Sequence, residues 1–138
     1  MKCRPKGLAI TTGPYPGFPT DLQSPFMAFL AAGEGQSVIE ERVFEGRFAT
    51  VKSLEKMGAS ICTRGRCAVI EGRYPLKEAV VHASDLRGGA ALAVAALAAE
   101  GRTIIRDCRH IERGYEDICR DLAVLGARIR WVDESCTL

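Results

Sequence analysis

Two aspartates, Asp21 and Asp85, stand at equivalent points of the sequence, each directly before an alanine-rich stretch. Asp21 follows a loop that holds three prolines and two glycines within residues 13–23. Because prolines reduce the entropy lost when a loop becomes ordered, such a loop can hold a carboxylate in a defined place, where it could act as a general base. The alternative for both aspartates is that they cap or electrostatically favour a helix start.

Three arginines could supply complementary charge: Arg47, Arg87 and Arg113. Arg87 is predicted in the first turn of an apolar helix, where a cation is unfavourable at the positive end of the helix dipole, and this indicates an anionic partner. Arg47 and Arg113 are each predicted to open a second helix, at matching points. Although a surface ion pair accounts for most isolated arginines, guanidinium groups suit phosphate and carboxylate. The residues alone predict an anion-binding site with a candidate carboxylate base.

The elements that position these residues occur twice, at an offset of about 64 to 68 residues. An alanine-rich helix over residues 24–32 matches one over residues 86–100, and Gly35 and Gly101 are expected to end these helices in a left-handed conformation. We expect each copy to form a βαβαββ unit, the first over about residues 6–72 and the second over about residues 77–133. The alanine-rich helices are expected to be buried against each other and covered by sheet.

Local signals predict the remaining elements. Residues 6–12 and 79–83 read as the entering strands, and residues 61–70 as a hairpin that turns at Gly65. The start of the first helix has two candidates, a capping box from Thr20 to Gln23 or a start at Ser24 and Pro25. Apolar residues at spacings of three and four predict an inward face on each second helix: Phe48, Val51 and Leu54, and then Tyr115, Ile118, Leu122 and Leu125.

Composition narrows the class of protein. The chain has 138 residues, of which 47% are hydrophobic and 26% charged, and its net charge is +2 with both signs spread along it. We therefore expect a globular unit with no nucleic-acid or membrane surface. Six cysteines without a Cys-x-x-Cys spacing, and no signal segment, predict a reduced, cytoplasmic protein. Only Cys108 and His110 lie close as possible metal ligands, and no phosphate-binding glycine loop is present, so no metal or cofactor is expected.

Four segments resemble signatures of the UDP-N-acetylglucosamine enolpyruvyl transferases, in that family's order: residues 13–23, 43–48, 84–90 and 110–116. The resemblance implies an inside-out α/β barrel of βαβαββ units, of which this chain would supply two in a partial domain. It also implies the reaction, in which the 3-hydroxyl of UDP-N-acetylglucosamine attacks phosphoenolpyruvate and phosphate is released, at the start of peptidoglycan synthesis.

The resemblance also implies roles for individual residues. Asp21 matches the aspartate that binds the sugar hydroxyl and takes its proton, and Val43 matches a backbone contact to the UDP-sugar, with Phe44 beside it. Arg87 and Arg113 match arginines that face the anions of phosphoenolpyruvate, and Arg47 matches one near the closing cleft. Asp85 lies in the same motif as Arg87 and is counted with the substrate-binding residues.

The resemblance has two local departures and one large gap. Gly46 stands where the family usually has asparagine, and Gly88 and Gly89 replace a more usual Ala-Ser, which we expect to loosen these turns. The family's mobile-loop proton donor, its early lysine and asparagine, and much of its uridine site have no match here. The resemblance therefore implies that this chain needs the N-terminal part of the enzyme and is inactive alone.

Two alternatives remain open on the sequence. One is a non-catalytic binding or regulatory module of the same fold, which the retained Asp21 and arginines disfavour. The other is the shikimate-pathway enolpyruvyl transferase, which the loop of residues 13–23 disfavours.

Overall fold

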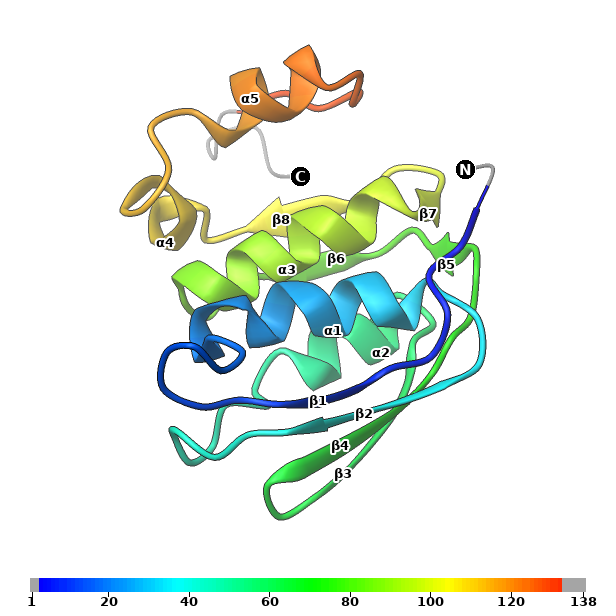
Figure 1. The fold of residues 1–138 in the computed structure, drawn as a ribbon. Coiled ribbons are helices and arrows are strands. Elements are labelled where there is room, and N and C mark those ends of the chain that lie inside the picture. Colours follow the sequence, from blue (N-terminus) through cyan, green and yellow to red (C-terminus); the bar gives the residue numbers. More distant parts are fainter. Residues whose placement is uncertain (1–2, 133–138) are drawn as a thin grey trace.

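Two helices lie side by side at the centre of the molecule, α1 (Gln23–Ala31) and α3 (Leu86–Leu97), with strands on either side of the pair (Figure 1). The structure is a computed structural model and describes residues 3–132. Ala28 and Ala31 of α1 and Ala91 and Ala95 of α3 are all completely buried. Small side chains let the two helix backbones approach closely, so the predicted burial of the alanine-rich helices against each other is confirmed.

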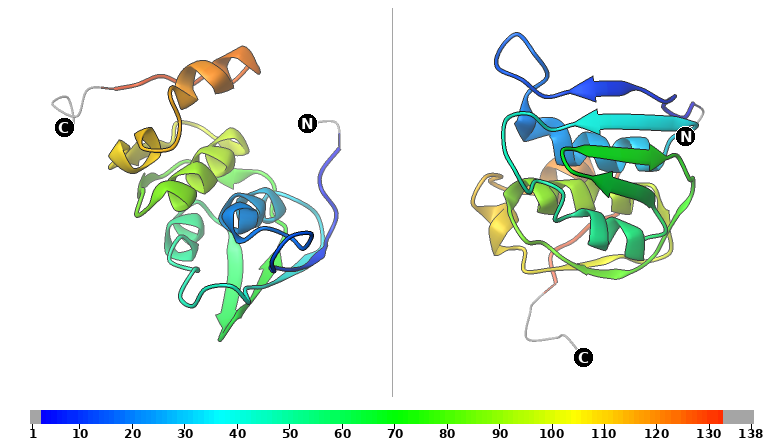
Figure 2. Two further views of the ribbon diagram at one scale, coloured as in Figure 1. Left: turned by 60° about the vertical axis from the view of Figure 1, so that its left-hand side comes forward. Right: turned by 90° about the horizontal axis from the view of Figure 1, so that it is seen from below.

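A four-stranded sheet covers one side of this helix pair. It contains β1 (Ala9–Thr11), β2 (Gln36–Glu40), β4 (Cys67–Glu71) and β3 (Ser60–Arg64) in that spatial order, as Figure 2 shows from below. β1 runs parallel to β2, whereas β4 is antiparallel to both of its neighbours. The predicted hairpin is confirmed, and Gly65 turns it with a positive φ of 58°, a conformation that costs glycine little.

The inner face of the sheet packs on α1 and on α2 (Val51–Lys56). Ile39 and Ile70 point inward from the strands, Leu54 comes from α2, and none of the three has any exposed surface. Burying side chains of this kind stabilises a fold by about 1.5 to 3 kcal/mol each. The order of the first half is thus strand, helix, strand, helix and hairpin, as the first copy of the repeat predicts. Arg47 does not open α2, because the helix begins at Val51, after a turn.

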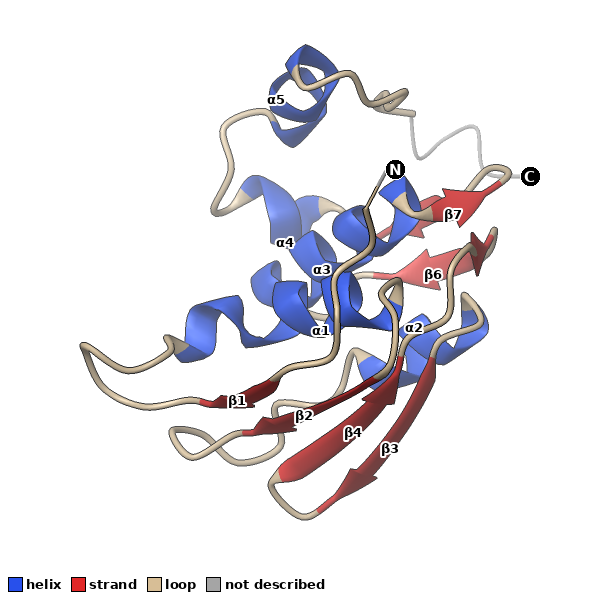
Figure 3. Cartoon of the chain, turned by 45° about the vertical axis from the view of Figure 1, so that its right-hand side comes forward, coloured by secondary structure: helices blue, strands red, loops and turns tan. Residues whose placement is uncertain are grey.

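The second half starts in the same way and then differs. β6 (Val80–His82) and β8 (Ile104–Arg106) pair in parallel beside α3, and two short helices follow, α4 (Arg109–Glu112) and α5 (Ile118–Val124) (Figure 3). No strand follows α5 up to residue 132, so the hairpin of the first half has no counterpart in the described part of the second half. The last residue of the second predicted unit, Asp133, lies outside the described residues.

Two details of the predicted second helix are wrong. Arg113 does not open a helix, because it is the C-cap of α4, and α5 begins instead after Asp117, whose carboxylate accepts the backbone N–H of Arg120. Leu125 does not point inward, because 82% of it is exposed. Ile118 does point inward, as predicted, and it joins Ile111 in a small second core.

The helix ends also differ from the prediction. α3 ends at Leu97 rather than at residue 100, because β7 (Ala99–Glu100) pairs in parallel with β5 (Leu76–Lys77). Gly35 and Gly101 have the expected positive φ, 77° and 87°. They do not cap the helices, since the C-caps are Ala32 and Ala98. Both glycines belong to the turns that lead into β2 and β8.

Gly88 and Gly89 lie inside the first turns of α3, where both are buried. A β-carbon on Gly88 would lie 2.6 Å from Thr50 Oγ1, and one on Gly89 would lie 2.5 Å from Ile111 Cγ1. The sequence had indicated that these glycines loosen a turn, but they lie in a helix and do not do so. They let α3 pack against the residue that precedes α2 and against α4.

Three further expectations from the sequence concern membrane-spanning helices, disulfides and metal sites. Within residues 3–132, no helix has the length and apolar character needed to span a bilayer. The cysteines of this stretch form no disulfide, and Cys136 lies outside it. Nowhere in the described chain do three histidine, cysteine, aspartate or glutamate side chains gather in a way that could hold a metal ion.

Candidate functional site

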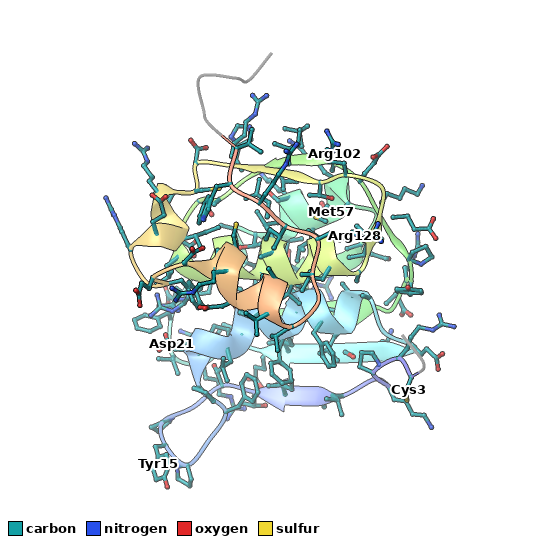
Figure 4. The ribbon with its side chains drawn as sticks, turned by 90° about the horizontal axis from the view of Figure 1, so that it is seen from above. Cys3, Tyr15, Asp21, Met57, Arg102 and Arg128 are labelled. Carbon is teal, nitrogen blue, oxygen red and sulfur yellow. The ribbon has the colours of Figure 1, made fainter. Side chains whose placement is uncertain are left out.

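The structure brings Asp21 together with two of the three arginines singled out in the sequence. Arg87 donates through Nε to Asp21 Oδ1 at 2.6 Å, and Arg47 Nη1 lies 4.0 Å from the same oxygen. The three residues come from separate elements: the short 3-10 helix η1 (Thr20–Leu22), the turn before α2, and the first turn of α3. Asp21 remains 65% exposed and lies on the outside near the start of α1 (Figure 4). The group is therefore open to solvent and accessible to a ligand.

Arg87 has the anionic partner that its position indicated, and the partner is Asp21 itself. Asp85 caps the helix that carries Arg87, because its Oδ1 accepts the backbone N–H of Gly88 at 2.7 Å. The other carboxylate oxygen of Asp85 accepts the hydroxyl of Ser84. The capping interpretation of Asp85 is confirmed. The cap also fixes the turn from which Arg87 reaches Asp21.

Arg47 is the least exposed of the charged residues in this group, with 22% of its side chain exposed. Its guanidinium carbon lies 4.1 Å from the centre of the Phe44 ring, which is the geometry of a cation–π contact. Its Nη1 atom is buried and makes no hydrogen bond with the described chain. An open pocket of about 280 Å³ adjoins both side chains and is lined also by Glu41, Glu45 and Phe48.

The third arginine, Arg113, makes no ion pair or hydrogen bond with Asp21, Arg47 or Arg87. It is exposed, and its side chain makes no ion pair or hydrogen bond with residues 3–132. Its neighbour Gly114 packs against the side chain of Leu86, because a β-carbon there would lie 2.5 Å from Leu86 Cδ2. The backbone next to Arg113 therefore touches the start of α3, one residue before Arg87.

Glu41 is a central residue of the site that the sequence analysis missed. It is 1% exposed, and its Oε1 accepts hydrogen bonds from the Thr12 hydroxyl at 2.9 Å and from the backbone N–H groups of Val43 and Phe44 at 3.1 and 3.2 Å. The Thr20 hydroxyl donates to both carboxylate oxygens at 3.0 Å. The capping box predicted at Thr20 is thus wrong, because its hydroxyl binds Glu41 rather than a helix N–H. α1 has no side-chain cap at all.

The burial of Glu41 continues the pattern of β2, which the sequence itself does not show, because Val38 and Ile39 are both apolar. Burial alternates along β2, where Ser37 and Ile39 point inward, and the same period of two places residue 41 on the inner side. This alternation of burial in the structure places the Glu41 carboxylate inside, just beyond the strand. Buried carboxylates need hydrogen-bond donors, and here the donors come from Thr12 and from Thr20, 29 and 21 residues earlier in the chain.

Two carboxyl groups with lowered pKa lie outside this site, both in the second half. The hydrogen bond to His82 holds the pKa of Asp107 below its ordinary value, and Nδ1 of His82 lies 2.8 Å from Asp107 Oδ2. The backbone N–H of Arg120 lowers the pKa of Asp117, and the indole N–H of Trp131 adds to this effect. The Trp131 bond to Asp117 Oδ1 measures 3.1 Å.

The sequence profile of one family, EPSP synthase (3-phosphoshikimate 1-carboxyvinyltransferase), matches residues 1–122. The chain is 50% identical over 133 residues to a UDP-N-acetylglucosamine 1-carboxyvinyltransferase from Synechocystis sp., a match that covers 96% of this chain and 30% of that protein. It is 51% identical over 130 residues to the enzyme of that name from Finegoldia magna, covering 94% of this chain and 31% of that protein. The chain thus spans about 30% of the length of these relatives.

Solved structures show the same likeness. The enolpyruvyl transferase NikO from Streptomyces tendae superposes with a TM-score of 0.83 at 33% identity, covering 94% of this chain and 30% of that one. An EPSP synthase from Acinetobacter baumannii superposes with a TM-score of 0.57 at 21% identity, over 72% of this chain and 23% of that one. Because its identity is only 21%, the second match shows similarity of fold alone.

Proposed function

The chain belongs to the EPSP synthase (3-phosphoshikimate 1-carboxyvinyltransferase) family, and from this membership we propose that it carries one part of the active site of a UDP-N-acetylglucosamine 1-carboxyvinyltransferase. Such an enzyme transfers the enolpyruvyl group of phosphoenolpyruvate to the 3-hydroxyl of UDP-N-acetylglucosamine and releases phosphate. The reaction is the first committed step of peptidoglycan synthesis, and we place it in the cytoplasm. The observation that carries the proposal is an exposed Asp21 carboxylate bonded to Arg87 and adjoined by Arg47.

Asp21 is the proposed base. The sugar hydroxyl becomes acidic only as its oxygen bonds to the central carbon of phosphoenolpyruvate. For the base that takes the proton, correct position therefore matters more than high basicity. Asp21 meets this need, since the loop before it is tied down and Arg87 holds one of its oxygens at 2.6 Å. The other oxygen makes no hydrogen bond or ion pair with the described chain, which leaves it available to a hydroxyl.

The arginines are proposed to bind the anionic substrate. Arg87 and Arg47 offset the charge of the phosphate and carboxylate groups while that charge shifts during the reaction. The Arg113 side chain has no ion-pair or hydrogen-bond partner in residues 3–132 and is proposed to meet phosphoenolpyruvate when the cleft closes. Asp85 is proposed to act with Arg87, whose turn it fixes. No metal or cofactor takes part in the proposed chemistry.

The UDP-sugar is proposed to lie along residues 43–47. The backbone N–H of Val43 is already donated to Glu41, which leaves its carbonyl as the atom that can accept a hydrogen bond from the sugar. Phe44 is 48% exposed and borders the open pocket beside Arg47. An aromatic ring and a carbonyl next to an arginine suit a molecule that has both apolar faces and hydroxyl groups.

We further propose that the active site is completed by the rest of a longer enzyme. The proton donor and most uridine contacts have no counterpart in this chain, and the strands of the second half form two separate pairs, β5 with β7 and β6 with β8, where the first half has one four-stranded sheet. The full domain is proposed to be the inside-out α/β barrel of the family, with repeat units over about residues 6–72 and 77–133. The isolated chain is proposed to be inactive.

The shikimate-pathway reaction is the main competing function. The relatives at 50% and 51% identity carry the UDP-N-acetylglucosamine name, whereas the EPSP synthase structure is similar at 21% identity. The first comparison supports the UDP-sugar as the acceptor substrate. The retained carboxylate and arginines disfavour the other alternative, a non-catalytic binding or regulatory module.

A chimaera tests the proposal. This chain replaces the segment it matches in the Synechocystis relative, and phosphate release from phosphoenolpyruvate is measured with UDP-N-acetylglucosamine or shikimate 3-phosphate as acceptor. We expect turnover with the UDP-sugar only. Asp21→Asn keeps size and hydrogen bonding but removes the base, so kcat should fall about a hundredfold or more with a smaller change in KM. A folded but inactive chimaera, or a fully active Asp21→Asn variant, would contradict the proposal.

A further inference from the structure

Glu41 is the only carboxyl side chain of residues 3–132 that is almost fully buried. All of its hydrogen-bond donors are neutral: two threonine hydroxyls and two backbone N–H groups. No cation pairs with it in the described chain. Burying a carboxylate is costly unless its oxygens are satisfied, and the folded chain satisfies them only by bringing these distant donors to one point.

The donors belong to two segments that carry site residues. Thr12 and Thr20 stand at the two ends of the proline-rich loop, and Thr20 immediately precedes Asp21. Val43 and Phe44 belong to the second segment, and the Phe44 ring lies under the guanidinium of Arg47. Glu41 is therefore one hydrogen bond from the residue before Asp21 and one hydrogen bond from the residue that supports Arg47.

Further contacts fix Glu41 and the ends of the loop. The Glu41 N–H donates to the Arg66 carbonyl of the β3–β4 hairpin at 2.8 Å, and the Thr12 hydroxyl oxygen accepts the Arg42 N–H at 2.9 Å. Within the loop, the Gly13 N–H donates to the Phe18 carbonyl at 3.0 Å and the Gly17 N–H to the Pro14 carbonyl at 2.7 Å, while Tyr15 at the tip is 98% exposed (Figure 4). Backbone bonds therefore close the loop on itself, and the Glu41 carboxylate joins the base of the loop to the segment of Val43 and Phe44.

We propose that Glu41 is a positioning residue, which sets the relative placement of Asp21 and Arg47 by accepting hydrogen bonds from both of their segments. It does not touch substrate in this role. The geometric part of the inference stands on the structure alone, and the kinetic part rests on the proposed function. A displacement of about 1 Å at a reacting group can cost about a hundredfold in rate. Loss of the Glu41 carboxylate should therefore displace Asp21 and lower the rate.

The first test measures backbone amide exchange by NMR in the 138-residue chain. Glu41→Ala removes the acceptor, so the amides of Val43 and Phe44 should exchange about tenfold faster or more. Glu41→Gln keeps Oε1 as an acceptor and can donate to Thr20, so exchange should change less than about threefold. Glu40→Ala is the matched control, because the Glu40 side chain bonds only to Arg42 in the described chain. Unchanged exchange in Glu41→Ala would overturn the inference.

The second test is a double-mutant cycle in the chimaera, at a temperature where circular dichroism shows every variant folded. Glu41→Ala should lower kcat/KM about a hundredfold, and Glu41→Gln should restore it to within about fivefold of the parent value. In the Asp21→Asn background the same Glu41→Ala change should cost less than about tenfold, since the residue it positions has already lost its function.

Additive losses in that cycle would show a merely structural role and overturn the inference, as would a Glu41→Gln variant as impaired as Glu41→Ala. These outcomes differ from a failure of the proposed function. An active parent chimaera with an unimpaired Glu41→Ala variant overturns the inference alone. An inactive parent chimaera overturns the proposed function, and the exchange measurement then decides the geometric part by itself.

Discussion

The two halves of the molecule begin alike and end differently. In the first half, the parallel pair β1 and β2 is extended by a hairpin, and the residue that follows α2, Met57, has no exposed surface. In the second half, no hairpin extends the parallel pair β6 and β8 within the described residues, and the residue that follows α5, Leu125, is 82% exposed. Both residues precede a glycine with positive φ, Gly58 and Gly126. The same local pattern is thus buried in one half and exposed in the other.

The difference between the halves shows which parts of the candidate site are held in place by contacts within the chain. Asp21 and Arg47 belong to the first half, where Glu41 ties their segments to each other and to the hairpin. Arg87 comes from α3 of the second half, whose alanines are buried against α1 of the first half. Arg113 is the C-cap of α4, on the less covered side, and its side chain makes no ion pair or hydrogen bond within the described chain. The base is therefore the best fixed of the proposed groups, and Arg113 is the one most dependent on what covers the second half.

The matched pair Met57 and Leu125 gives the largest expected effect on stability. Met57→Ala empties a fully buried site, so the free energy of unfolding should fall by about 2 to 5 kcal/mol. Leu125→Ala removes a side chain that is already exposed, so the change should stay within about 0.5 kcal/mol. Urea unfolding followed by circular dichroism measures both. A similar loss of unfolding free energy in the two variants would mean that Leu125 is buried in solution, and would contradict the difference between the halves.

A smaller effect should appear at low pH, and in the second half first. The pKa of Asp117 is lowered in the folded chain, so as pH falls below the ordinary aspartate pKa of about 3.9 the unfolded chain takes up a proton before the folded chain does. The carboxylate therefore contributes stability above that pH, and this contribution is lost as pH falls through the lowered value. Asp107, with its pKa lowered by His82, acts in the same direction.

Trp131 reports this change, because it is the only tryptophan of the chain and donates to Asp117. Its fluorescence should shift with a midpoint below the ordinary aspartate pKa. Asp117→Asn keeps an acceptor oxygen but does not titrate, so the transition should disappear. A transition of the same midpoint and size in Asp117→Asn would assign it to another group.

Much of the first half could be predicted from the sequence. The Gly65 turn, the alanine-rich helices and the entering strands are encoded by short-range patterns, and the structure has all of them. The electrostatic misfit of Arg87 in a helix first turn correctly indicated an anionic partner. What the pattern did not contain was the identity of that partner, since Asp21 lies 66 residues away.

The features that the sequence did not reveal depend on contacts across the chain. The interpretation of Thr20 as a capping residue failed because Glu41, 21 residues later, binds its hydroxyl. Gly88 and Gly89 were expected to loosen turns, and only the packing of Thr50 and Ile111 shows that a β-carbon would not fit there. The spacing that ends at Leu125 indicates an apolar face, but nothing in the described chain covers that residue.

Phosphate release by the 138-residue chain alone, with phosphoenolpyruvate and UDP-N-acetylglucosamine, tests most directly whether this chain holds the base and arginines of an active site that it cannot complete. An active site that lacks its other face loses the positioning of the substrates, which can be worth about 7 to 11 kcal/mol. We therefore predict no phosphate above the background of the Asp21→Asn chain, under conditions where the chimaera turns over. Turnover by the isolated chain that Asp21→Asn abolishes would contradict this account, because residues 1–138 would then contain a complete active site.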